Sequence, residues 1–436
     1  QGKKALTTKW VFTRKLIVSS TGDESIRYKA QLVVRGFEQK YGVDFTDTFA
    51  PVIAHKTIRI LLAMAAMEKC HVHQMDVKTA FLNGEIEEEI YILPPQGFSM
   101  KDLPNTGKSK LEKVLRLKKS LYGLKQAPLV WNSTISKFLK EKLGFTQSEE
   151  DPGLYVRSDI VLALYVDDML LVSKSLSTIQ EMKDALSREY LMSDLGEARR
   201  FLGMEIKITK PEKGPWTISV GQERYITDIL NRFGLYQCRG MDTPMAENGR
   251  MDKAPSDFQQ DPDNVTTYLQ MLGCLMYAMT CTRPDLAFTM SHLSQFSQNS
   301  TYEHMKALKR VYHYLQQTKT MSLTYRGPEV SEDPADFRLH AYCDADWGGD
   351  KSERRSTSGY CVFLAGACVV WASRRQASTA ASSTEAEWMA AALATEELLW
   401  IRHLLVELEY FAAPAHPRPK IPRLQHPNTQ HYLNPS

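Results

Sequence analysis

The chain has 436 residues, 24% of them charged, and a formal net charge of +3. Its length exceeds what one hydrophobic core organises and predicts about two to four domains. The composition excludes a disordered or collagen-like chain, and the near-neutral charge means that any nucleic-acid surface must come from local clusters of Lys and Arg.

The cysteines indicate a reducing compartment. The seven cysteines are odd in number and form no Cys-x-x-Cys pair, which argues against a zinc ribbon and a disulfide framework. No apolar run is long enough to cross a bilayer, so no membrane partner is expected. The first residues, Gln-Gly-Lys-Lys, carry neither an initiator Met nor a secretory segment, and we expect a piece of a longer polyprotein or a truncated gene copy.

The N-terminal residues 9–39 are predicted to form a β-hairpin. Apolar and polar residues alternate on both sides of a turn-like stretch at 20–23. The second arm carries Arg27, Lys29 and Arg35, which have donors for phosphate oxygens. For each of these three residues, a solvated strand face is an equally good interpretation.

A helix is predicted over residues 57–69, with Thr57 as its cap, and we interpret it as scaffold. The next stretch, His73 to Gly84, places Asp76 at the end of a short strand. A lone Asp in that position is commonly a helix cap or turn residue, and this alternative stays open.

The stretch from Val161 to Ser173 predicts a tight β-hairpin with Asp167 and Asp168 at its tip, because two apolar runs flank the acid pair. Taken alone, the pair is either a solvated turn or half of a divalent-metal site. Together with Asp76, however, it supplies the three carboxylates that a two-metal phosphoryl-transfer site requires.

The stretches around Asp76, Tyr122-Gly123 and Asp167-Asp168, in this order, resemble a copia-type retrotransposon reverse transcriptase over roughly residues 10 to 410. The resemblance implies an α+β fold: a right-hand polymerase with fingers, palm and thumb, then a connection and an incomplete RNase H-like α/β domain. The boundaries it implies are 1–215 for fingers and palm, 216–330 for thumb and connection, 331–410 for the partial RNase H-like domain, and 411–436 for a Pro-rich, disordered tail.

The same resemblance implies roles for individual residues. Asp76, Asp167 and Asp168 would be catalytic and would hold two Mg²⁺ ions, with Mn²⁺ as a substitute. The residues implied at the incoming nucleotide are Val77, through its carbonyl, Phe81, Tyr122, Gly123, Lys29 and Arg35. Phe81 would exclude a 2′-hydroxyl, although core packing is its alternative role, and Gly123 has the alternative of a simple turn.

Further elements follow the family order. We expect a helix after Pro128 that runs to about Leu143, an amphipathic helix over 179–190, a primer-grip hairpin at 201–206 and a thumb helix over 222–235. Three more helices are expected at about 268–281, 285–297 and 304–317. The last carries Lys306, Lys309 and Arg310, which could track a duplex backbone or form a solvated face.

Two positions depart from the family pattern. Leu129 stands where Arg is usual, and Ser193 stands where Lys is common. The first change removes a phosphate or carboxylate contact, and the second removes a proton donor for departing pyrophosphate. Ser193 as an ordinary helix cap is an equally good interpretation.

The RNase H-like part predicts strands at 337–344, 359–364 and 367–371, then a helix opened by Ser382 and Glu385 at capping-box spacing. Asp344 and Glu387 match the family's first two metal ligands, although the glutamates can instead complement the helix N-terminus. After Glu409 the chain has no Asp or Glu. Two carboxylates are too few for two Mg²⁺ ions, so no RNase H activity is expected.

The expected function is therefore RNA-directed DNA polymerisation, with dNTPs added to a primer 3′-hydroxyl. The expected partners are an RNA template, a DNA or tRNA primer, dNTPs and other retrotransposon polyprotein products. The expected location is the cytoplasm, including virus-like particles, or the nucleus. One alternative is a decayed, inactive remnant that at most binds nucleic acid. The other is an RNA-dependent RNA polymerase, which Phe81 argues against because it would exclude a 2′-hydroxyl.

Overall fold

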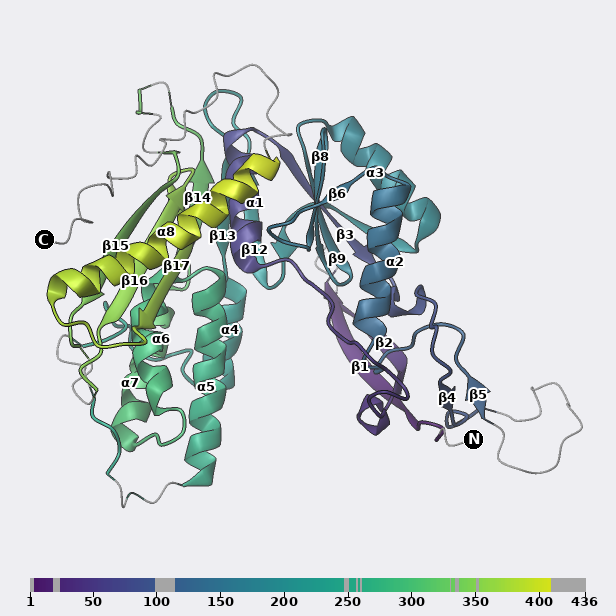
Figure 1. Cartoon of the computed structure of the whole chain (residues 1–436), viewed down its shortest axis with the longest axis horizontal. Helices are drawn as coiled ribbons and strands as arrows, with labels where there is room; N and C mark the ends of the chain where they lie inside the picture. Colours follow the sequence, from purple (N-terminus) through teal and green to yellow (C-terminus); the bar gives the residue numbers. More distant parts are fainter. Residues whose placement is uncertain are drawn as a thin grey trace, which may run out of the picture.

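The computed structural model describes residues 4–18, 24–98, 114–246, 251–255, 258, 261–329, 331–333, 337–349 and 353–408. The tail predicted at 411–436 lies outside these residues. Figure 1 shows a mixed α/β molecule in which the β1–β2 ribbon and the helices α4–α7 extend to the same side of the central strands. No helix in the described ranges has the length and apolar character needed to span a membrane.

The N-terminal ribbon confirms the predicted hairpin. Strands β1 (Thr8–Val18) and β2 (Glu24–Val34) pair antiparallel along their whole length. A short 3₁₀ turn, Gly36–Glu38, follows. At the base of the ribbon, Leu6, Val34 and Leu124 form a small buried cluster beside the two-residue strands β4 (Tyr91–Ile92) and β5 (Leu115–Arg116).

A six-stranded sheet with the order β10-β3-β9-β8-β7-β6 forms the centre of this half of the chain. Helices α2 (Ala127–Glu141) and α3 (Leu176–Glu189) cover one face and bury its alternate side chains, as the period-two pattern of strands requires. Both helices were predicted. The strands are β3 (His71–Val77), β6 (Thr146–Gln147), β7 (Leu154–Arg157), β8 (Ile160–Tyr165), β9 (Asp168–Ser173) and β10 (Met192–Glu197).

Helix α1 (His55–Met67) packs on the opposite face and confirms the predicted helix, with one correction. Its N-cap is Ala54 rather than Thr57. The Thr57 hydroxyl donates instead to Asp151 Oδ2 at 2.5 Å, and the same oxygen accepts from the Ala54 amide at 2.9 Å. A carboxylate from a distant loop therefore satisfies the start of the helix, which local sequence could not indicate.

A second, four-stranded sheet lies beside α1, with strands β11 (Arg200–Phe201), β12 (Met204–Thr209), β13 (Thr217–Gly221) and β14 (Ser322–Arg326). The predicted hairpin at 201–206 is present: Leu202 and Gly203 both have positive φ, as a two-residue hairpin turn of this hand requires. The predicted boundary at residue 215 falls between β12 and β13, which are hydrogen-bonded neighbours.

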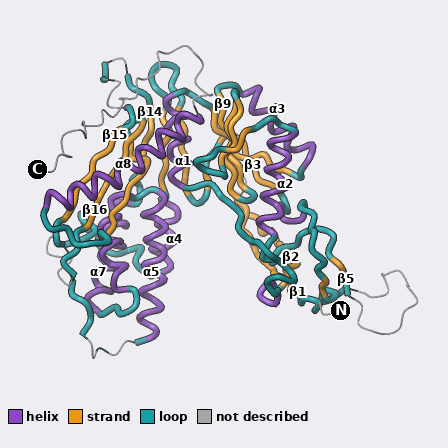
Figure 2. The backbone as a smooth tube through the Cα atoms, in the orientation of Figure 1, coloured by secondary structure: helices purple, strands orange, loops and turns teal. Residues whose placement is uncertain are grey.

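Four helices with one shared core follow: α4 (Glu223–Arg232), α5 (Pro262–Cys281), α6 (Ala287–Leu293) and α7 (Tyr302–Thr318). Figure 2 shows them gathered below the strands. All four were predicted, but α5 begins six residues earlier than expected. Asp261 caps it by accepting from the Asp263 amide, and Pro262 occupies the first turn, where its missing N–H costs nothing.

The C-terminal unit has three antiparallel strands, β15 (His340–Asp346), β16 (Thr357–Leu364) and β17 (Ala367–Arg375), and the long helix α8 (Ser383–Leu408). These elements match the predicted ones. The predicted cap is also present: the Glu385 amide donates to Ser382 Oγ at 3.1 Å, and the Glu385 carboxylate accepts from the Ala381 amide at 2.6 Å.

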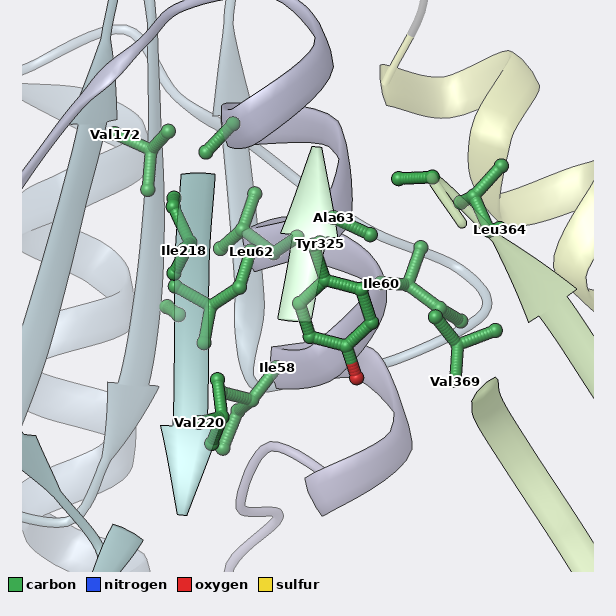
Figure 3. Close-up of a cluster of buried hydrophobic side chains, with 14 of the residues drawn as sticks. Ile58, Ile60, Leu62, Ala63, Val172, Ile218, Val220, Tyr325, Leu364 and Val369 are labelled. Carbon is green, nitrogen blue, oxygen red and sulfur yellow. The ribbon is translucent and has the colours of Figure 1, made fainter. Parts of the chain in front are cut away.

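One hydrophobic core joins both sheets and the C-terminal unit around α1. Figure 3 shows Ile58 and Leu62 of α1 beside Val220 and Ile218 of β13, with Tyr325 of β14 at the centre. The same cluster reaches β9, β16 and β17 through Val172, Leu364 and Val369. The C-terminal unit is therefore packed into the main body rather than tethered to it.

Candidate active site

The three predicted acids lie at one end of the six-stranded sheet. Asp76, the penultimate residue of β3, pairs directly with Asp168, the first residue of β9. The Val77 amide donates to the Asp167 carbonyl at 2.9 Å. Two stretches that are far apart in the sequence are thereby held together by backbone pairing at this end of the sheet.

The predicted acid hairpin is confirmed, but its tip is shifted by one residue. Strand β8 ends at Tyr165, and Tyr165 pairs with Asp168, so the two turn residues are Val166 and Asp167. Asp168 belongs to the strand because its backbone continues the ladder on both sides, to Tyr165 and to Asp76. Val166 has a φ of +56°, a left-handed conformation that a β-branched residue rarely adopts.

The pKa of Asp168 responds to its surroundings, which include the other two acids. Burial, followed by the charges of Asp167 and Asp76, raises the pKa of Asp168 from 3.8 to about 6, while a hydrogen bond from Gln74 acts in the opposite direction. Burial and the same two charges also raise the pKa of the Tyr122 hydroxyl. The phenol therefore lies within the electrostatic field of the acids, and the role of Tyr122 at the nucleotide stays a prediction.

Carboxylate oxygens from three aspartates are ligands that suit a hard divalent cation such as Mg²⁺. Mutual repulsion raises the free energy of the charged set, so a bound cation would be stabilising here. Among the residues that the structure describes, however, no three His, Cys, Asp or Glu side chains are grouped as a metal cage. The donor chemistry fits a divalent cation, and the ligand geometry is not preformed.

Phe81 and Tyr122 lie together beside the acids. Phe81 is in the 3₁₀ turn Ala80–Leu82 that follows β3, and its ring centroid is 5.1 Å from that of Tyr122. The Phe81 ring also packs against the cluster under α2 and against the cluster at the base of the ribbon. The structure thus places Phe81 both near the site and in the packing that its alternative role predicted.

Gly123 has a structural explanation of its own. Its φ is +93°, and a Cβ atom there would overlap the Val34 carbonyl of β2. The Val34 amide donates to the Tyr122 carbonyl at 2.8 Å, which draws the two backbones together. Glycine is therefore required at position 123 because the backbone of β2 lies so close to it. The predicted role of Gly123 at the nucleotide stays a prediction.

The predicted basic residues are spread over separate elements. Lys29 is exposed on β2, opposite Thr13, and Arg35 is exposed just after the strand. On α7, Lys306 and Lys309 are exposed, whereas Arg310 donates to Thr243 Oγ1 at 3.0 Å. Arg310 is therefore engaged in a contact within the fold, and Lys306 forms an exposed ion pair of 3.8 Å with Glu303 on the same helix.

Ser193 lies next to the acids. It pairs with Asp76 from β10, on the side of β3 away from Asp168, so Ser193, Asp76 and Asp168 form one row across three strands. Directly paired residues of antiparallel strands point to the same face. The side chain of residue 193 therefore lies on the face of the sheet that carries Asp76 and Asp168. Leu129, the other departure, lies in the first turn of α2 and is half-buried.

Two site residues were missed by sequence reasoning. Gln74, buried on β3, donates to Asp168 Oδ1 at 3.4 Å. Its position two residues before Asp76, and thus on the same strand face, was the available signal. Trp131 of α2 donates its indole N–H to the Val166 carbonyl at 2.6 Å. Trp131 has the sequence surroundings of an ordinary core residue, so no neighbouring residue indicated a role near the site.

The two RNase H-like acids are exposed. Asp344 lies on β15 opposite Gly359, and Glu387 lies in the first turns of α8. Neither belongs to a metal-binding group within the described ranges. The two positions are on adjoining elements, as predicted, but the structure does not test a role for them.

Comparison with known proteins decides the family. A model of the family described as reverse transcriptase (RNA-dependent DNA polymerase) matches residues 1–247. The chain belongs to the reverse transcriptase family. Its relatives place it among copia-type retrotransposon Pol polyproteins, as the sequence motifs predicted.

Three relatives of this reverse transcriptase show how much of each protein is shared. The Pol polyprotein of transposon TNT 1-94 of Nicotiana tabacum is 39% identical over 94% of this chain and 30% of the relative. The Pol polyprotein of transposon RE1 of Arabidopsis thaliana is 37% identical over 92% of this chain and 26% of the relative. A putative transposon Ty5-1 protein of Saccharomyces cerevisiae is 34% identical over 74% of this chain and over the whole length of the relative. The chain thus spans less than a third of the two Pol polyproteins.

Proposed function

We propose that this reverse transcriptase is an active RNA-directed DNA polymerase that adds dNTPs to a primer 3′-hydroxyl. The observation that carries the proposal is the pairing of Asp76 with Asp168, together with the Val77–Asp167 backbone hydrogen bond of 2.9 Å. In this proposal the β1–β2 ribbon belongs to the fingers, the six-stranded sheet is the palm, and α4–α7 form the thumb and part of the connection.

Asp76, Asp167 and Asp168 would hold two Mg²⁺ ions, or Mn²⁺ in their place, with the Val77 carbonyl as a further ligand. When bound, such ions supply activation of the 3′-hydroxyl and neutralisation of the departing pyrophosphate. The chain contributes three aspartates whose backbones are held together where the paired strands end. Gln74 donates to Asp168 and thereby favours its charged, ligand-competent form.

The side chains around the acids would select the nucleotide. Phe81 stands beside Tyr122 with a ring separation of 5.1 Å, and a ring there would exclude a ribose 2′-hydroxyl. Lys29 on the ribbon and Arg35 just after it would bind the triphosphate, since both are exposed and positively charged. The proposed partners are an RNA template and a DNA or tRNA primer.

The wider setting is also part of the proposal. Because the chain corresponds to less than a third of Pol polyproteins, other polyprotein products would complete a replication cycle. We propose that it acts in the cytoplasm, including virus-like particles, or in the nucleus.

Primer extension on poly(rA)/oligo(dT) tests the proposal. Purified wild-type protein with Mg²⁺ is expected to incorporate dTMP, and Asp167→Asn is expected to lower the rate at least about a thousandfold. Asp344→Asn is the matched control, because this exposed aspartate lies on β15, outside the proposed palm, and it is expected to leave the rate unchanged. Equal incorporation by wild type and Asp167→Asn, or none by either, would remove the polymerase assignment.

A second candidate is an inactive remnant that at most binds nucleic acid. Ser193 favours it, since the usual lysine is absent from the row that contains Asp76 and Asp168. The same extension assay separates the two, because a remnant would show no Mg²⁺-dependent incorporation.

RNase H activity is proposed to be lost. Asp344 and Glu387 are exposed, and two carboxylates do not hold two metal ions. The purified chain is expected to leave the RNA strand of an RNA–DNA hybrid intact in a gel assay with Mg²⁺ or Mn²⁺. Cleavage that is lost in Asp344→Asn would contradict this expectation.

A further inference from the structure

The turn that carries Asp167 is held from two sides by two different elements. The Val166 carbonyl accepts from the Trp131 indole N–H at 2.6 Å, and the Asp167 carbonyl accepts from the Val77 amide at 2.9 Å. Consecutive carbonyls of a two-residue turn are thus fixed by α2 on one side and by the end of β3 on the other.

The turn needs such support because of its sequence. Val166 has a φ of +56°, where the branched Cβ of valine is crowded against its own backbone. Two-residue hairpin turns with positive φ are usually built with Gly, Asn or Asp, which adopt this conformation without that crowding. The side chain of Val166 packs against the cluster under α2, so the surroundings rather than the local sequence select its conformation.

Trp131 is suited to provide that support. It is 1% exposed, and its ring packs edge-on against Tyr190 with centroids 5.3 Å apart. An indole N–H is a donor only and requires an acceptor when buried, so the hydrogen bond to Val166 is fixed once the ring is packed. The next residue, Asn132, anchors the same turn of α2 by donating to the Pro51 carbonyl at 3.3 Å.

Trp131 itself does not belong to the face that carries the acids. Met75 and Val77 point into the cluster that contains Trp131, so Asp76 between them points to the opposite face of the sheet. The indole therefore acts on Asp167 through the backbone of the turn.

We infer that Trp131 is a positioning residue for Asp167. Its N–H fixes the peptide plane between Val166 and Asp167, which sets the direction in which the Asp167 carboxylate leaves the turn. Loss of this donor frees the peptide plane and disperses the carboxylate over several orientations. The inference rests on the proposed polymerase function for its effect on rate, but its effect on the turn is independent of that function.

The test removes the N–H and keeps the ring. Trp131 is replaced by β-(3-benzothienyl)alanine, in which sulfur takes the place of the indole N–H. Phe138→Leu is the matched control, because Phe138 lies on the same helix and packs on the same Tyr190 at 5.3 Å. Primer extension gives kcat and the KM for dTTP, and hydrogen exchange is followed on the backbone of residues 164–170.

The isostere is expected to lower kcat at least about tenfold while KM changes less than about twofold, because binding groups are untouched and only orientation is lost. Exchange at 164–170 is expected to accelerate at least about tenfold, and Phe138→Leu is expected to change neither quantity. An unchanged kcat or an unchanged exchange rate in the isostere would overturn the inference. If wild type incorporates nothing, the proposed function fails, and the exchange rates alone decide whether Trp131 holds the turn.

Discussion

At the scale of single residues, the site brings together charges that disfavour one another. The paired positions of Asp76 and Asp168 come from the backbone ladder, and the pKa of the half-buried Asp168 is raised to about 6. A site of this kind lowers the stability of the free protein in exchange for cation binding. This loss of stability can be measured in the absence of substrate.

Asp168→Asn is expected to stabilise the metal-free protein at pH 8. The native pKa lies above the ordinary value, so the native state holds this proton more tightly than the unfolded chain does. Stability from this group is therefore present at low pH and is lost as the pH rises from about 4 through 6. Removing the charge should raise the free energy of unfolding by roughly 1–2 kcal/mol at pH 8, because solvent partly screens the half-buried carboxyl.

Urea denaturation of wild type and Asp168→Asn at several pH values measures this effect. The difference between the two proteins should be small near pH 4, grow up to about pH 6 and then stay constant. Asp344→Asn, at an exposed position, serves as the control. A difference that is independent of pH, or a destabilised Asp168→Asn at pH 8, would contradict the raised pKa of Asp168 in the native state.

At the scale of elements, helix α1 connects parts that are distant in the sequence. Arg59 is buried and donates to the Val369 carbonyl of β17 at 2.7 Å and to the Thr280 and Cys281 carbonyls at the end of α5, both at 2.8 Å. Its guanidinium also lies 4.0 Å from the ring centroid of Trp371. One side chain thus joins α1, the helical unit and the C-terminal sheet.

Arg59→Met is expected to lower the free energy of unfolding by roughly 3 kcal/mol, since three carbonyls lose their donor and two of these hydrogen bonds are buried. Lys174→Met is the control: Lys174 forms an ion pair of 2.7 Å with Glu68 just after α1, but both side chains are substantially exposed. That pair should contribute less than about 1 kcal/mol. Equal stability losses in the two variants, measured by urea denaturation, would contradict the role assigned to Arg59.

The elements themselves could largely be predicted from the sequence, and their ends less well. The hairpin around Asp167 was predictable because apolar runs and acids mark it locally. The start of α1 was not, because its cap depends on Asp151, nearly a hundred residues away. The hydrogen bond from Trp131 to the Val166 carbonyl could not be predicted for the same reason, since the sequence around a buried indole does not indicate which carbonyl accepts from it.

At the scale of the whole molecule, the C-terminal unit is part of the main body. Helix α8 contacts α1 through the ion pair Lys56–Glu397 at 2.6 Å, and Trp400 Nε1 donates to the Glu150 carbonyl at 3.3 Å. Its apolar residues Ile401 and Leu404 belong to the core that includes α1. Composition and motif order suggested separable domains, and only the three-dimensional packing reveals the shared core.

A chain that ends at residue 330 is therefore expected to fold poorly, because it loses one side of the core around α1. A chain that ends at residue 408 keeps every described residue and is the reference for this comparison. Thermal unfolding followed by circular dichroism compares the three proteins. A cooperative transition at an unchanged temperature for the chain ending at 330 would show that the C-terminal unit is dispensable.

A double-mutant comparison decides whether the paired strand ends form one catalytic site. Primer extension is measured with wild type, Asp76→Asn, Asp167→Asn and the variant that carries both changes. Groups that act as a unit give non-additive losses, so the double variant is expected to be no more than about threefold slower than either single variant, with each single loss at least about a thousandfold. Losses that multiply, or a single variant that keeps the wild-type rate, would contradict a shared site at the end of β3 and the β8–β9 turn.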